Sequence, residues 1–316
     1  MEKVSKLTIA PPKVAILLCT FNGRHHLEEQ LDSFDAQLHD NWKVWASDDG
    51  SHDDTLSILE AYQKRWPNGQ LSISFGPTKG FTANFLSLAC NSSIESDFYA
   101  YSDQDDIWEP MKLTCALEWL NTIQADIPAL YCSRTLLVDA NNNEIGLSPL
   151  FKKQPGFANA LIQNIGGGNT MVFNNSARKL LQEAGCNLPV TSHDWWTYML
   201  ITGCGGEVFY DSCPTVRYRQ HKSNLVGSNT TWLSRIKRIQ KLWNGRFRQW
   251  NDVNIQGLRN MYMMLTPEAQ KVLESFDLGR ESSLISRVIL LKRSGIYRQT
   301  LLGNLGLVAA ALFKKL

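Results

Sequence analysis

The first 125 residues repeat one pattern, in which an apolar run of strand length leads into a polar loop and then into a segment with helical spacing. Residues 14–19 form the first such run, and the polar loop 20–23 follows them. Runs without polar alternation are typical of strands that are covered by helices on both faces. The pattern therefore predicts an α/β fold with a mostly parallel central sheet flanked by helices.

The rest of the chain supplies further expected elements. Helical spacing of Leu27, Leu31, Phe34 and Leu38 predicts the first helix, and the other expected strands and helices are 44–47, 56–62, 71–75, 81–90, 98–102, 130–138 and 193–200. From residue 231 onward, Lys, Arg and Trp interleave with helical periodicity and no strand-like run is visible. We expect a main domain over residues 1–225 and a helical, basic and amphipathic region over residues 226–316.

Charge and cysteine usage limit the partners and the location of the chain. The net charge of +2, from 32 basic and 30 acidic residues, argues against nucleic acid as the main partner. Seven scattered cysteines without a Cys-x-x-Cys pair are typical of reduced thiols, and the first 13 residues lack the apolar core of a signal peptide. We expect a cytoplasmic protein. The basic C-terminal region favours peripheral contact with an anionic membrane at its inner face, and the alternative is a helical subdomain with a solvated basic face.

An acidic cluster follows the expected strand 98–102. Asp103, Asp105 and Asp106 crowd three carboxylates at the end of a buried run, where they repel one another unless a cation or a proton compensates them. Mg²⁺ and Mn²⁺ prefer oxygen ligands and are commonly held by one or two carboxylates plus substrate phosphates. The cluster therefore predicts a divalent metal, and its alternative is a solvated acidic loop.

Two other polar loops follow expected strands. Thr20, Phe21 and Asn22 come after the first strand, and Asp49 comes after the second. In an open parallel sheet, ligands bind where the carboxyl ends of the strands meet. A nucleotide base needs a carboxylate acceptor for its ring N–H and an apolar floor, which these residues supply. The alternative for Asp49 is a turn followed by a helix cap.

Asp194 stands beside Trp195 and Trp196, next to an expected helix. An acid in this setting can act as a general base while the indoles stack on an acceptor sugar. The alternative is a packed helix start, with Asp194 as a capping charge and both indoles in the core.

Two weaker signals complete the expected site. The glycine run 166–168 lets the backbone approach a ligand closely, so Gly167, Gly168 and Asn169 are candidates for acceptor contact, and the alternative is a bend between strands. His221 could reach a metal or a diphosphate, or it is an ordinary surface residue. The chain has neither a Gly-x-Gly-x-x-Gly motif after the first strand nor a P-loop, so a metal is expected to hold the diphosphate.

Three segments taken together carry a family resemblance. Residues 15–23, 47–51 and 102–106 read AILLCTFNG, SDDGS and SDQDD, and in this order they resemble family 2 of the nucleotide-sugar glycosyltransferases. The resemblance covers about residues 12–225. It implies the GT-A fold, which is Rossmann-like, followed here by a C-terminal helical appendage.

The resemblance also implies roles for individual residues. Thr20, Phe21, Asn22 and Asp49 would line the base and ribose pocket with Gln104 beside the donor, whereas Asp103 and Asp105 would form the D-x-D motif that holds Mg²⁺ or Mn²⁺. Asp194 matches the position of the catalytic carboxylate. This chain departs from the common Glu-Asp pair at that point, because His193 precedes Asp194.

Residues 104–108 and 218–227 look like the rhamnosyltransferase-like branch of bacterial polysaccharide enzymes. This favours dTDP-L-rhamnose as the donor over other dTDP sugars or UDP sugars. The acceptor would be a saccharide, free or linked to a polyprenyl diphosphate. Two rivals are a nonenzymatic module that binds nucleotide sugars or polysaccharide and a metal-dependent phosphohydrolase or nucleotidyltransferase. Neither readily explains an acidic cluster together with an aromatic-flanked acid.

Overall fold

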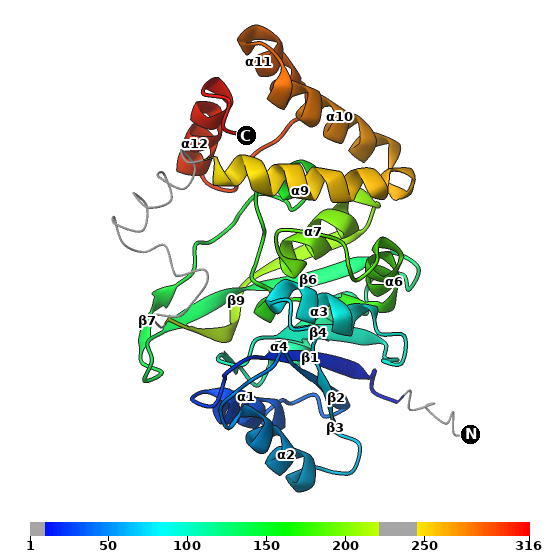
Figure 1. The fold of residues 1–316 in the computed structure, drawn as a ribbon, viewed down its shortest axis with the longest axis vertical. Coiled ribbons are helices and arrows are strands. Elements are labelled where there is room, and N and C mark those ends of the chain that lie inside the picture. The colour runs from blue at the N-terminus through cyan, green and yellow to red at the C-terminus, as the bar shows by residue number, and fades with distance from the viewer. Residues whose placement is uncertain (1–9, 221–244) are drawn as a thin grey trace, which may run out of the picture.

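The computed structural model describes residues 10–220 and 245–316, and its centre is a nine-stranded sheet (Figure 1). The strands are β1 (Val14–Thr20), β2 (Trp42–Asp48), β3 (Leu71–Phe75), β4 (Phe98–Ser102), β5 (Ile107–Trp108), β6 (Ala129–Val138), β7 (Glu144–Leu147), β8 (Val172–Asn174) and β9 (Glu207–Arg219). Their order is β3-β2-β1-β4-β8-β6-β9-β5, with β7 paired to β6.

Helices cover this sheet. They are α1 (Leu27–Asp35), α2 (Thr55–Arg65), α3 (Phe81–Cys90), α4 (Lys112–Leu120), α5 (Phe157–Ala160), the 3₁₀ turn η1 (Gly168–Thr170), α6 (Asn175–Ala184) and α7 (His193–Gly203). The C-terminal helices are α9 (Arg246–Asn260), η2 (Tyr262–Met264), α10 (Pro267–Glu281), α11 (Leu284–Arg293) and α12 (Leu301–Leu312).

The first four strands form the parallel half of the sheet. Strand β1 lies between β2 and β4, and all seven of its residues are buried, as an uninterrupted apolar run requires. Thr20 pairs with Asp48 and Leu18 pairs with Ser102, so the ends of the three strands lie at one edge. The other half is mixed, because β8 runs antiparallel to both β4 and β6 while β9 runs parallel to β6. The predicted α/β fold with a mostly parallel sheet is confirmed.

Alternate residues of β1 enter two hydrophobic cores. Ile16 packs with side chains of α1, α2 and α4 on one face, and Leu17 packs with side chains of α3, α6 and α7 on the other. The helix expected to reach Leu38 ends at Asp35, and Leu38 is exposed. Its backbone N–H donates to the carbonyl of Pro110 instead of continuing the helix.

The C-terminal helices stack beyond α7, at the end of the molecule opposite α2 (Figure 1). Ile255, Leu258 and Phe276 belong to the same core cluster as Tyr101 of β4. The expected C-terminal helical region is thus present over residues 245–316 and shares the core of the sheet. The boundary expected near residue 225 lies outside the described residues. Among those residues, none of the helices combines the length and apolarity that crossing a bilayer demands.

Candidate active site

The loops after β1, β2 and β4 meet at one edge of the sheet, where ligands bind in open parallel sheets. The thiol of Cys19 lies at this meeting point. Burial raises its pKa well above the usual value, and the carboxylates of Asp103 and Asp49 raise it further. The acids after β4 and β2 therefore both face the end of β1.

Thr20 and Asp48 join the first two loops through a buried hydrogen bond. The Thr20 hydroxyl donates to Asp48 Oδ1 at 2.8 Å, and the other carboxylate oxygen accepts from the backbone N–H groups of Gly50 and Ser51. Thr20 is buried, so its side chain supports the expected donor pocket and does not line it, which corrects that part of the prediction. Asp48 was not predicted, because a buried carboxylate that is bonded to backbone N–H groups and hydroxyls of two loops leaves no pattern in the sequence.

Asp49 remains accessible at the edge. Its two oxygens accept the backbone N–H groups of Thr78 and Gly80, at 2.6 and 2.9 Å, and fix the segment between β3 and α3. A carboxylate has about four acceptor positions, so these two bonds leave capacity for the ring N–H of a base. The geometry is compatible with the expected role of Asp49.

Phe21 offers an exposed aromatic surface beside Asp49. Its side chain is 54% exposed, while its backbone N–H and carbonyl form hydrogen bonds of 2.8 and 2.9 Å with the side-chain amide of Gln104. Gly23 permits this approach, since a Cβ there would overlap the Gln104 amide. Asn22 has a φ of 50° and its side chain accepts the N–H of His52. The loops after β1 and β4 are thus joined through Gln104.

Asp103 and Asp106 occupy different environments in the acidic loop. Burial raises the pKa of Asp103 well above its usual value, and the neighbouring carboxylates Asp106 and Asp105 add to that shift. Both carboxylate oxygens of Asp106 are bonded inside the protein, because one accepts from the Asn169 amide at 2.5 Å and the other from the Arg219 backbone N–H at 3.2 Å. Burial, followed by the charge of Asp105, raises the pKa of Asp106 to about 7. Asp106 therefore supports the loop from within.

Two buried cations balance these acids. The Lys112 ammonium donates to the carbonyl of Asn169 at 2.5 Å, and burial lowers its pKa to about 7 although Asp106 and Asp103 oppose the shift. The Arg219 guanidinium donates to the backbone carbonyl of Asp105 at 3.1 Å and to the carboxylate of Glu29 at 2.7 Å. Neither cation was predicted, because Lys and Arg are expected at the surface.

Asp103 and Asp105 fit a divalent ion by their chemistry. The Asp103 carboxylate receives no hydrogen bond from the described residues, and crowding by like charge favours a cation beside it. Hard carboxylate oxygens are the ligands that Mg²⁺ and Mn²⁺ take together with substrate phosphates. Within residues 10–220 and 245–316, no group of three or more His, Cys, Asp or Glu side chains is arranged to hold a metal without a substrate. His221, the third predicted ligand, lies outside the described residues.

Asp194 lies in the first turn of α7, facing the same edge. One of its oxygens accepts the N–H of Trp195 at 2.7 Å and the other accepts the N–H of Gly168 at 3.1 Å. The side chain is only partly buried, at the N-terminus of α7. Asp194 also contributes to the raised pKa of Asp103, after burial and the nearer acids. The turn η1 links α7 to the acidic loop, because Gly168 bonds Asp194 and the neighbouring Asn169 bonds Asp106.

The glycine run packs against α7. A Cβ at Gly168 would overlap Nε2 of His193, so only glycine lets the turn η1 come this close. Gly167 is exposed and remains available to an acceptor, whereas Asn169 is buried and its amide is bonded to Asp106. The expected acceptor contact of Asn169 is thus wrong, because its side chain supports the acidic loop.

His193 is a buried, neutral residue behind Asp194. Its ring stacks on Phe85 with centroids 3.9 Å apart, and neither ring nitrogen has a hydrogen-bond partner among the described residues. Burial lowers its pKa to about 4. His193, which stands where the common pair has glutamate, therefore contributes packing and no charge to the site.

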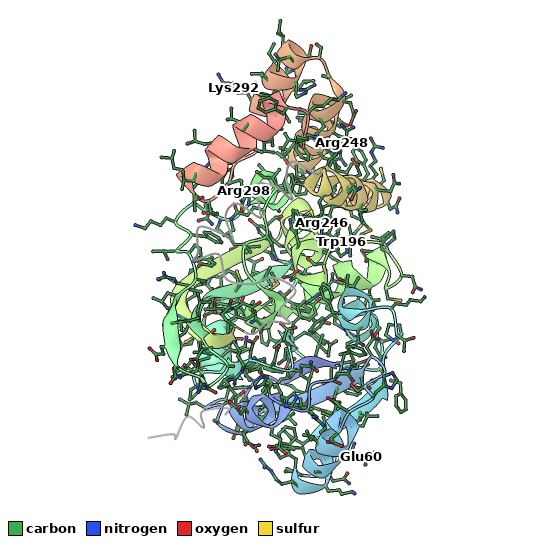
Figure 2. The ribbon with its side chains drawn as sticks, turned by 60° about the vertical axis from the view of Figure 1, so that its left-hand side comes forward. Glu60, Trp196, Arg246, Arg248, Lys292 and Arg298 are labelled. Carbon is green, nitrogen blue, oxygen red and sulfur yellow. The ribbon has the colours of Figure 1, made fainter. Side chains whose placement is uncertain are left out.

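Trp195 and Trp196 fill the core and do not line the site, as Figure 2 shows for Trp196 next to the C-terminal helices. The Trp195 indole donates to the carbonyl of Ala160 at 2.6 Å. Trp196 packs so closely on α9 that a Cβ at Gly257 would lie 3.0 Å from its ring. The expected acceptor contact of both indoles is corrected to the packing alternative.

The sheet, its ligand edge and the acidic loop after β4 define a GT-A glycosyltransferase fold. The chain belongs to glycosyl transferase family 2, whose model matches residues 15–181. The family membership confirms the resemblance seen in the sequence and sets aside the nonenzymatic and phosphohydrolase alternatives.

Relatives and solved structures agree with this class. A dTDP-rhamnosyl transferase, RfbG of Shigella flexneri, is 28% identical over 245 residues, which are 73% of this chain and 81% of RfbG. Residues 1–349 of TarS from S. aureus, solved with UDP-GlcNAc, superpose with a TM-score of 0.54 at 15% identity, covering 90% of this chain and 93% of that one. The mannosyltransferase PcManGT from Pyrobaculum calidifontis, solved with GDP-Man and Mn²⁺, gives 0.50 at 16% identity over 98% and 88% of the two chains.

Proposed function

We propose that this glycosyltransferase is an inverting, metal-dependent enzyme that transfers L-rhamnose from dTDP-L-rhamnose onto a saccharide acceptor. The donor is favoured by the similarity to RfbG across 73% of the chain. The product class is a bacterial cell-surface polysaccharide of the O-antigen or capsule type. The alternative is a UDP-sugar donor on the same fold.

One observation carries the proposed reaction. Asp194, on α7, and the acidic loop after β4 come from distant parts of the chain and are joined through η1, because the Gly168 N–H donates to Asp194 and the Asn169 amide donates to Asp106. Phe21 and Asp49 are also accessible at this edge of the sheet. This arrangement separates a site for the donor diphosphate from a base for the acceptor hydroxyl. Asp194 is held by the backbone N–H groups of the buried residues Gly168 and Trp195, which keeps its position fixed before substrates bind.

The proposed step is a single displacement. Asp194 accepts the proton of the acceptor hydroxyl while that oxygen attacks the anomeric carbon. The bond from the anomeric carbon to the diphosphate oxygen breaks, the nucleoside diphosphate leaves with the electron pair, and the configuration inverts. Phe21 and Asp49 hold the base and Gln104 orders the loop between them. Asp103 and Asp105 would hold Mg²⁺ or Mn²⁺, which supplies charge stabilisation to the leaving diphosphate.

We place this reaction in the cytoplasm, with the acceptor free or linked to a polyprenyl diphosphate at the inner face of the membrane. Exposed Gly167, beside Asp194, is the proposed acceptor contact. Nucleic acid has no part in the reaction.

A donor panel tests the proposal. The full chain is incubated with dTDP-L-rhamnose, UDP-sugars or GDP-sugars and a lipid-linked saccharide, with Mg²⁺ or Mn²⁺ and with a chelator. We expect acceptor-dependent release of dTDP that stops on chelation. The fastest release from a UDP-sugar would establish the alternative donor, and release unaffected by the chelator would remove the metal from the proposal.

A further inference from the structure

The C-terminal helices α11 and α12 expose an unusual amount of aliphatic surface. On α11 the exposed apolar residues are Leu284, Ile285, Val288 and Ile289, and on α12 they are Leu301, Leu302, Leu305, Val308 and Leu312. Ile285 is 75% exposed and Leu301 is 78% exposed. We call these nine side chains the aliphatic face. Exposed apolar surface concentrated in this way marks an interaction site.

The spacing shows that each helix turns one side outward. Leu301, Leu305, Val308 and Leu312 follow the i, i+4, i+7, i+11 pattern of a single helical stripe. Ala310, on the other side of α12, is buried in the core, as Leu291 of α11 is. The inner sides of both helices are therefore packed, and the outer sides have no covering residues in the described chain.

Arg287 ties the two helices together. Its guanidinium is buried and donates to the carbonyl of Ala311 at 3.0 Å and to the carbonyl of Ser282. These bonds hold the C-terminal end of α12 against the start of α11. The aliphatic face thus belongs to a braced helix pair, which is suited to presenting a rigid surface.

The segment that carries this face is basic, although Glu281 at the end of α10 pairs with its Lys314 at 3.8 Å. Residues 282–316 contain no Asp or Glu, and their six basic residues are Arg287, Lys292, Arg293, Arg298, Lys314 and Lys315. Lys292 and Arg293 are exposed at the end of α11 and make no ion pair within the described chain. Figure 2 places Lys292 and Glu60 at opposite ends of the molecule, with α11 and α12 at the Lys292 end. Aliphatic side chains flanked by cations match the interfacial region of an anionic bilayer.

We propose that the aliphatic face of α11 and α12 docks on the surface of an anionic lipid bilayer, with Lys292 and Arg293 at the headgroups. A second copy of the chain is a poorer occupant, because a symmetric contact would bring two mainly basic surfaces together. Lysine is also depleted in protein–protein interfaces. The start of α9, where Arg and Trp interleave, is a poorer lipid contact, since Arg248 is paired with Glu281 and Arg246 lies over Trp250 (Figure 2).

Vesicle flotation of the full chain tests this inference. The probes are vesicles of phosphatidylcholine alone and vesicles that also contain phosphatidylglycerol. We expect binding to the anionic vesicles, weakened by high salt, and at least tenfold loss in the double variant Ile285→Glu with Leu301→Glu. The matched control is Met263→Glu, which places the same charge on an 88% exposed apolar residue outside both helices and should leave binding unchanged.

A second pair of variants examines the charges. Lys292→Glu and Arg293→Glu should each weaken binding to anionic vesicles by about fivefold or more, the equivalent of one lost headgroup contact. Lys64→Glu on α2 reverses an exposed lysine at the opposite end and should have no effect. Circular dichroism confirms that the variants remain folded.

Two results would overturn the inference. One is unchanged flotation of the Ile285→Glu, Leu301→Glu variant. The other is self-association of the wild-type chain that the same variant abolishes, without any vesicle binding, because the occupant would then be a second copy. The measurement needs neither donor nor acceptor, so its failure leaves the proposed transfer reaction untouched, and a failed donor panel leaves lipid docking untouched.

Discussion

The side-chain amide of Gln104 and the backbone of Phe21 exchange two hydrogen bonds, of 2.8 and 2.9 Å, and this pair joins the loop of the expected base site to the acidic loop. We expect Gln104→Ala to weaken donor binding about fivefold, since a net hydrogen-bond loss of ~1 kcal/mol loosens the position of Phe21. Calorimetric titration with dTDP measures this. Gln104→Glu replaces the donating amide with an oxygen that repels the Phe21 carbonyl and should lose at least as much, so equal affinity in all three proteins would contradict the role of the pair.

Asp194→Asn should lower turnover by roughly a hundred- to ten-thousandfold, because the amide cannot accept the proton of the acceptor hydroxyl. Donor affinity should stay near that of the wild type, since Asp194 lies across the site from Phe21 and Asp49 in the proposed arrangement. Initial rates of nucleotide release and titration with dTDP give the two quantities. Glu118→Gln, an exposed carboxylate on α4, controls for the loss of a charge. Normal turnover in Asp194→Asn would show that another group is the base.

Gly168→Ala should both destabilise the fold and reduce turnover. The new methyl group would overlap His193, which is stacked on Phe85 and cannot move aside, so η1 must shift away from Asp194. Overpacking of this kind costs about 1–3 kcal/mol. Gly306→Ala in α12 is the matched substitution, because nothing lies within 4 Å of the added carbon and helix propensity favours alanine. Urea unfolding compares the two, and equal stability would refute the packing argument.

His193 should make the protein less stable in mild acid. Its pKa falls from 6.5 to about 4 in the folded state because the ring is buried, so the unfolded chain binds the proton first as the pH decreases. The contribution of the neutral His193 ring to the unfolding free energy is complete above pH 6.5 and is lost as the pH falls toward about 4. Between about pH 7 and pH 5 this amounts to about 2 kcal/mol of unfolding free energy.

The variant His193→Leu isolates that contribution. Its unfolding free energy, measured with urea at both pH values, should fall by about 2 kcal/mol less than that of the wild type. His25→Gln alters an exposed histidine and should keep the wild-type dependence. Identical pH dependence in all three proteins would mean that the buried imidazole is not responsible.

The parallel half of the fold could be predicted from the sequence because its strands are short apolar runs. Residues 71–75, 81–90 and 98–102 form elements with the expected bounds. Strand β9 was missed, since Glu207–Arg219 shows neither an apolar run nor a regular alternation of buried and exposed positions and carries Pro214 within it. Strand β8 has only three residues, and its antiparallel insertion between β4 and β6 depends on partners that are distant in sequence.

The residues of the candidate site also fall into those that the sequence could predict and those that it could not. Phe21, Asn22, Asp49 and Asp103 follow strands directly, so the topology alone brings them to one edge. Lys112, Arg219 and Asp48 could not be found, because their importance comes from burial in a polar network that sequence does not reveal. The roles of Trp195 and Trp196 were ambiguous in the sequence, because a tryptophan that stacks on a sugar cannot be distinguished by residue type from one that packs in the core.

The close packing of Trp196 on Gly257 couples two ends of this enzyme. Helix α7 carries Asp194 on its first turn and Trp196 half a turn later, so the C-terminal helices pack against the segment that carries the proposed base. The C-terminal helices share a core with the sheet and are therefore not a separable anchor. Whatever surface holds these helices also sets the tilt of the catalytic edge, and shortening the chain from its C-terminus would loosen the reaction centre as well as its attachment.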